Sequence, residues 1–106
     1  MDTIEIIKEQ LQSNQILLYM KGSPDAPQCG FSSKASQILI ACGKPFSFVD
    51  ILLNPEIRAN LPEYSNWPTF PQLFVNGELI GGSDILSELH ENGELKAIID
   101  EVISED

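Results

Sequence analysis

The residues with the clearest chemical potential lie in the stretch 27–32, where Cys29 follows a proline-rich segment and opens an amphipathic one. An apolar run at 16–20 precedes it, so we expect Cys29 at a junction between a strand and a helix. Unpaired backbone N–H groups and the positive end of the helix dipole stabilise a thiolate at such a position. Ser32 stands where a second thiol could have resolved a mixed disulfide, and a hydroxyl cannot do this. The chemistry therefore has to use one protein thiol and a reactant from outside.

Both cysteines are expected to be free. A cysteine is often a small core residue, but the loop before Cys29 and the helix start at it favour an exposed thiolate. Cys42 falls on the apolar side of the same helix and is expected to be inert core. A helix between the two separates them by about 20 Å, whereas a disulfide needs Cα atoms within about 7 Å. Free thiols and no visible targeting signal predict a reducing, cytoplasmic location.

Length and charge limit the possible partners. At 106 residues the chain is expected to be a single domain spanning 1–106. Sixteen Asp and Glu against six Lys and Arg give a net charge of −10, which makes nucleic acid and anionic membrane poor partners. The longest apolar run is five residues, far too short to span a membrane.

Hydrophobic spacing and turn residues predict the elements that position Cys29. The order is helix 2–11, strand 15–20, loop 21–28, helix 29–42, strand 46–50, a helix from 54 that ends near 62 or shortly after, strand 72–75, strand 78–80, and helices from 83 and 94. Asn54 and Pro55 mark a helix start, and Asn76-Gly77 marks a tight hairpin. The bond before Pro71 is a candidate cis peptide bond. On the helix from 29, Phe31 is expected to share the core-facing side with Cys42.

This order predicts an α/β fold. One parallel βαβ unit followed by a hairpin gives a four-stranded mixed sheet with helices on both faces, which is the thioredoxin-like architecture.

Four separated motifs carry a resemblance that covers nearly the whole chain. They are Lys21, Cys29-Gly30-Phe31-Ser32, Trp67-Pro68-Thr69-Phe70-Pro71 and Gly81-Gly82-Ser83-Asp84. In this order the chain resembles a monothiol glutaredoxin of the Cys-Gly-Phe-Ser type. The resemblance implies the glutaredoxin fold, glutathione binding, a [2Fe–2S] cluster that bridges a homodimer, and delivery of that cluster to recipient proteins. It also implies complexes with BolA-type partners and weak or absent thiol-transferase activity.

The resemblance assigns two cations to glutathione. Lys21 would lower the Cys29 pKa and contact the ligand, and Arg58 would pair with the glycyl carboxylate. Either residue could instead be a solvated surface cation.

Two further segments are assigned to the same ligand. Thr69, Phe70 and Pro71 would form a wall whose backbone pairs with an extended peptide, although a plain corner with Phe70 in the core is equally compatible with these residues. Trp67 is expected to shape this groove.

The third glutathione segment is a helix start. By resemblance Gly82, Ser83 and Asp84 would hold the γ-glutamyl end, with Asp84 facing its amino group. Ser83 or Asp84 could also be an ordinary N-cap. Many family members have Cys where Ser83 stands, and this departure puts a self-resolving redox cycle in doubt. Gly30 would allow close approach of a cluster or partner, and we assign no role to His90.

The number of ligands that a [2Fe–2S] cluster needs supports the hypothesis that this protein carries such a cluster. A [2Fe–2S] cluster needs four ligands, usually thiolates, and each chain offers one exposed thiol. Two chains and two glutathione thiols complete the set, as the metal role of Cys29 requires. The main alternative is a glutathione-dependent oxidoreductase that reduces protein–glutathione mixed disulfides at Cys29 as catalytic nucleophile. A third hypothesis is an adaptor for a BolA-type partner.

Overall fold

The computed structural model describes residues 2–103. Its elements in chain order are α1 (Thr3–Ser13), β1 (Ile16–Met20), β2 (Gly22–Ser23), β3 (Ala26–Pro27), α2 (Gly30–Ala41), β4 (Ser47–Asp50), α3 (Pro55–Ser65), β5 (Gln72–Val75), β6 (Glu78–Gly81), α4 (Ser83–Glu91) and α5 (Glu94–Ile103). Among the described residues, no helix combines the length and the apolar character needed to cross a membrane.

The four longer strands form one mixed sheet in the order β4-β1-β5-β6. Strand β1 pairs with β4 in parallel and with β5 antiparallel, and β5 pairs antiparallel with β6. All five residues of β1 are buried, as expected for a continuous apolar strand at the centre of a sheet. The predicted α/β fold with a four-stranded mixed sheet is confirmed.

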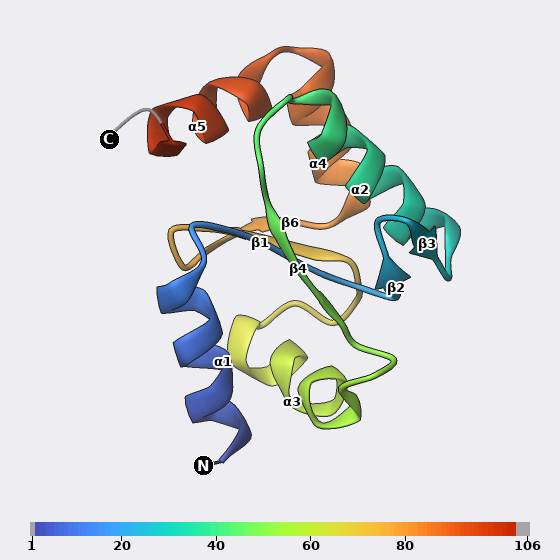
Figure 1. Ribbon diagram of the computed structural model, residues 1–106, viewed down its shortest axis with the longest axis vertical. Coiled ribbons are helices and arrows are strands. Elements are labelled where there is room, and N and C mark those ends of the chain that lie inside the picture. The colour runs from blue at the N-terminus through green and yellow to red at the C-terminus, as the bar shows by residue number, and fades with distance from the viewer. Residues whose placement is uncertain (1, 104–106) are drawn as a thin grey trace.

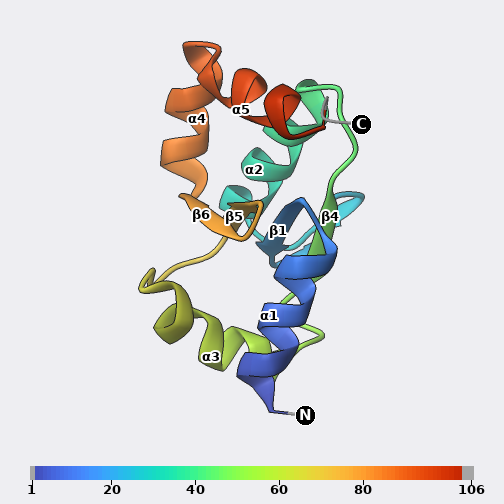
Figure 2. The same cartoon turned by 90° about the vertical axis from the view of Figure 1, so that its left-hand side faces the viewer.

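Helices cover both faces of this sheet (Figures 1 and 2). Helices α1 and α3 lie on one face, and α2, α4 and α5 lie on the other. Because side chains alternate along a strand, β1 divides its residues between two cores. Leu17 and Tyr19 join the cluster under α1 and α3, whereas Leu18 and Met20 join the cluster under α2, α4 and α5.

Several local predictions are confirmed. The Phe70–Pro71 peptide bond is cis. Asn76-Gly77 joins β5 to β6 with both residues at positive φ. Asn54 is the N-cap of α3 with Pro55 next to it, although the Asn54 side chain donates to the Asp50 carbonyl oxygen at 2.9 Å and makes no cap hydrogen bond. Cys42 is buried at the end of α2.

Of two further local predictions, one is corrected and one is confirmed. The segment 21–28 is not a plain loop, because β2 and β3 form a short antiparallel ribbon within it, closed by a bond from Gln28 N–H to the Lys21 carbonyl oxygen at 2.9 Å. The end of helix α3 agrees with the prediction that it lies near Pro62 or shortly after, because the helix continues through Pro62 to Ser65 and ends at Asn66 in the left-handed conformation. Proline removes one helical hydrogen bond but does not have to end a helix that is anchored by packing.

Phe31 is not part of the core. Its side chain is 63% exposed, while Ala35, Ile38, Leu39 and Cys42 on the same predicted face are buried. Phe31 lies in the first turn of α2, before the part of the helix that the core cluster covers. Helical spacing predicts which side of a helix faces the core. It does not predict which turns along the helix are covered by the rest of the protein.

Candidate functional site

The sulfur of Cys29 caps helix α2. Cys29 itself has an extended backbone, and its Sγ accepts a hydrogen bond from the Ser32 backbone N–H at 3.3 Å. The first helical bond, from Ser33 N–H to the Cys29 carbonyl oxygen at 2.9 Å, fixes the turn that follows. A short polar or sulfur side chain at this position satisfies an N–H group that the helix cannot satisfy internally. The local fold therefore holds the sulfur in the positive field of the helix start.

Ser32 connects this sulfur to the end of strand β1. Its side chain is completely buried, and its Oγ accepts a hydrogen bond from the Lys21 backbone N–H at 3.0 Å. The same Oγ lies 3.4 Å from Cys29 Sγ. Because the oxygen already accepts from Lys21, the single hydroxyl proton is free to face the sulfur when Cys29 ionises. The Ser32 hydroxyl is therefore more than the absence of a second thiol, and its position three residues after the helix cap is the one sequence feature that indicates this contact.

These contacts favour the thiolate of Cys29. Desolvation is the largest single effect on its pKa and raises it. The Ser32 hydroxyl, the backbone N–H groups of Ser32 and Phe31, and the charge of Lys21 act in the opposite direction and together outweigh it. The pKa of Cys29 is therefore below its ordinary value. For Cys42, burial and the Asp100 carboxylate raise the pKa, so this thiol stays protonated and inert.

A groove of about 770 Å³ runs beside Cys29, within the size range of small-molecule sites. Its lining contains eight of the residues that the sequence proposed for a ligand: Lys21, Arg58, Thr69, Phe70, Pro71, Gly82, Ser83 and Asp84. Cys29 is not in the lining, but Phe31, two residues after it, is. The exposed Phe31 ring is thus a wall of the groove, which the sequence interpretation of Phe31 as core missed.

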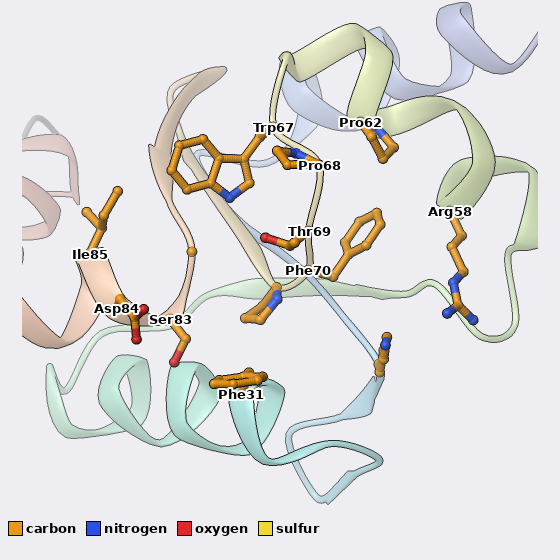
Figure 3. Close-up of a pocket in the computed structure, with 13 residues that line it drawn as sticks. Phe31, Arg58, Pro62, Trp67, Pro68, Thr69, Phe70, Ser83, Asp84 and Ile85 are labelled. Carbon is orange, nitrogen blue, oxygen red and sulfur yellow. The ribbon is translucent and has the colours of Figure 1, made fainter.

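The charges of this groove differ from those of the rest of the protein. Two of the six cations of the chain, Lys21 and Arg58, line it, whereas Asp84 is the only acid among residues 2–103 to do so. In Figure 3, Arg58 lies on one side of Phe70, and Ser83 and Asp84 lie on the other side. The groove therefore has a cationic end and, at the opposite end, a helix start with one carboxylate. An extended anion with a second, zwitterionic terminus matches this pattern.

Helix α4 begins at the second end of the groove. Gly82 is the N-cap and makes no side-chain cap bond, so neither Ser83 nor Asp84 is the N-cap that the sequence left open. Ser83 is 7% exposed, and within residues 2–103 its Oγ has no hydrogen-bond partner. A Cβ at position 82 would lie 3.2 Å from the Pro71 carbonyl oxygen and 3.3 Å from Trp67 Nε1, so a larger residue in this corner would be tightly packed against both neighbours.

The described residues offer one thiol for metal chemistry. Within 2–103 no group of three or more His, Cys, Asp or Glu side chains could hold a metal ion. Cys29 and Cys42 are both free, and only Cys29 is accessible.

Comparison with known proteins gives consistent results. The family model described as Glutaredoxin matches residues 16–80. "Glutaredoxin 4" of Escherichia coli strain K12 is 62% identical over 99 residues, which cover 93% of this chain and 86% of that protein.

Solved structures agree with this similarity. The solution structure of reduced poplar apo GrxS14 has a TM-score of 0.82 and 42% identity, and the match covers 95% of this chain and 93% of that chain. A buckwheat glutaredoxin–glutathione complex has a TM-score of 0.81 at 22% identity, covering 93% of this chain and 88% of that chain, and supports the fold alone.

Proposed function

This chain belongs to the glutaredoxin family, and from that premise we propose that it binds glutathione in the groove beside Cys29. The glycyl carboxylate would lie at the end formed by Lys21 and Arg58. The γ-glutamyl carboxylate would meet the N-terminus of α4 and the free Ser83 hydroxyl, with the amino group facing Asp84. The observation that carries this proposal is the separation of the two charged ends on one groove next to a stabilised thiolate.

We further propose that the protein carries a [2Fe–2S] cluster between two chains and transfers it to recipient proteins. Each chain would contribute the Cys29 thiolate, and glutathione in each groove would contribute the other two thiolates. This ligand set supports a homodimer that forms with the cluster, and the family resemblance adds BolA-type proteins as partners. In this role the lowered Cys29 pKa supplies a deprotonated ligand.

The lowered pKa of Cys29 also supports a second function, the reduction of protein–glutathione mixed disulfides. The Cys29 thiolate would attack the glutathione sulfur, release the protein thiolate and form a Cys29–glutathione disulfide. A second glutathione thiolate would then attack that glutathione sulfur, which releases Cys29 and glutathione disulfide. Ser32 cannot take the second step, so external glutathione is required.

Anaerobic reconstitution with iron and sulfide, with and without glutathione, tests these proposals. We expect a brown protein that is dimeric by size exclusion only when glutathione is present, and a monomeric apoprotein. Cys29→Ser should abolish cluster and disulfide turnover, whereas Cys42→Ser, at the buried thiol, should spare both.

The results separate the two functions. Cluster formation with negligible disulfide turnover favours the carrier, and fast turnover without a cluster favours the oxidoreductase. Equal cluster uptake without glutathione, together with no glutathione binding, would exclude the proposed ligand set. Loss of the cluster in Cys42→Ser would show that the assignment of the ligand to Cys29 is incomplete.

A further inference from the structure

Gln72 is a polar residue at a position where the fold calls for an apolar one. It opens strand β5 and is completely buried. Because side chains alternate along a strand, Gln72 shares a sheet face with Phe74, which packs in the core cluster under α1 and α3. A buried amide costs free energy unless it is hydrogen-bonded, so its contacts indicate what it does.

The amide nitrogen of Gln72 holds two carbonyl groups of the groove wall. Nε2 donates to the Trp67 carbonyl oxygen at 2.9 Å and to the Thr69 carbonyl oxygen at 3.1 Å. Only the nitrogen end of the amide can serve both, because the oxygen end would face two acceptors. One side chain thus fixes both ends of the short segment Trp67–Pro68–Thr69, which lines the groove together with Phe70 (Figure 3).

The bond to Thr69 also orients the next N–H group. The peptide unit between Thr69 and Phe70 is trans, since the cis bond of this segment is the following one. In a planar trans peptide the C=O and the N–H point in opposite directions. With the Thr69 carbonyl turned toward buried Gln72, the Phe70 N–H points away from the core, and within residues 2–103 it has no hydrogen-bond partner.

We propose that Gln72 is a positioning residue, which holds the Trp67 and Thr69 carbonyls inward and thereby presents the Phe70 N–H to the groove. There the N–H donates to a backbone carbonyl of an extended peptide ligand, in the manner of an added strand. The functional part of this inference rests on the glutathione binding proposed above. The structural part concerns the ligand-free protein and can be tested alone.

The test uses Gln72→Met, which keeps the size of the side chain and removes both donors. The matched control is Val75→Ala, a core substitution on the same strand that faces the other cluster. Amide hydrogen exchange measures how firmly the segment 67–69 is held, because the Trp67 N–H is bonded to the Pro62 carbonyl oxygen at 3.2 Å and exchanges when that bond opens. We expect Trp67 to exchange about tenfold faster in Gln72→Met, relative to the remote Ile51 amide, and to be unchanged in Val75→Ala.

The second arm titrates reduced glutathione into all three proteins. We expect affinity to fall about tenfold in Gln72→Met, as for the loss of one to two net hydrogen bonds, and to be retained in Val75→Ala. Equal exchange at Trp67 in Gln72→Met and unsubstituted protein would overturn the positioning role. If the unsubstituted protein does not bind glutathione, the proposed function is wrong, and exchange alone then decides the role of Gln72.

A measurement on the unsubstituted protein covers the case in which Gln72→Met does not fold. The side-chain amide protons of Gln72 should exchange slowly with solvent, because they are buried and bonded to two carbonyls. Rapid exchange of these protons in the folded, ligand-free protein would overturn the inference.

Discussion

Removal of the Ser32 hydroxyl should raise the pKa of Cys29. Ser32→Ala deletes the Oγ that lies 3.4 Å from Cys29 Sγ and leaves the backbone N–H at position 32, which donates to Sγ at 3.3 Å. A hydrogen bond to a charged group contributes about 1.5–3 kcal/mol. Cys29 is partly exposed, and sulfur accepts weakly over this distance, so we take the lower end of that range. This corresponds to about a tenfold smaller preference for the thiolate over the thiol.

The Ser32→Ala substitution should slow the reaction of Cys29 with alkylating reagents, because only the thiolate form of Cys29 reacts. The thiolate is the nucleophile, and it is lost as the pH falls through the pKa. In Ser32→Ala that loss occurs at higher pH, so at pH values well below both pKa values alkylation should be about tenfold slower. The substitution also leaves the partly buried Lys21 N–H without its acceptor, which should lower the free energy of unfolding by about 1 kcal/mol.

The assay is the pH dependence of iodoacetamide alkylation and of ultraviolet thiolate absorbance, measured on cluster-free protein. A Cys42→Ser background leaves one thiol in every sample. Ser33→Ala is the matched control, because the Ser33 hydroxyl accepts from Gln37 Nε2 at 3.4 Å and is not bonded to the sulfur. Identical titration curves for Ser32→Ala and its parent would refute the role assigned to the hydroxyl.

Two substitution pairs test the groove. Gly82→Ala places a Cβ 3.2 Å from the Pro71 carbonyl oxygen and should weaken glutathione binding and cost about 1 kcal/mol of stability, whereas Gly30→Ala meets nothing within 4 Å and should be tolerated. Glutathione titration and urea unfolding check both, and equal behaviour would contradict the packing argument. Phe31→Ala should change the free energy of unfolding by less than about 0.5 kcal/mol, whereas buried Phe74→Ala should cost about 3–5 kcal/mol; a large cost at Phe31 would contradict its exposed position.

Much of this protein could be predicted from local signals. The apolar run at 16–20, the cap and proline at Asn54-Pro55 and the turn at Asn76-Gly77 each act within a few residues, and the structure has the corresponding elements. The burial of Cys42 and the cis bond before Pro71 also followed from neighbouring residues. Such features depend on backbone sterics and on helical or strand periodicity, which a short stretch of chain determines by itself.

Other features depend on contacts between elements that are far apart in the chain. The resemblance assigned Lys21, Arg58 and Asp84 to one ligand, but only the packing of three separate elements brings them to one groove. Phe31 has core spacing and is nevertheless exposed, because the core covers α2 only from its second turn onward. Ser32 looked like an absent thiol and is a bridge between the end of β1 and the Cys29 sulfur. The hydrogen bond from Lys21 N–H to Ser32 Oγ joins residues that are eleven positions apart, and no local pattern specifies it. Local patterns in the sequence identify the accessible thiol and the elements on either side of it. The groove beside that thiol exists only in the folded protein, because contacts between elements form only when the sheet and its two helical layers assemble.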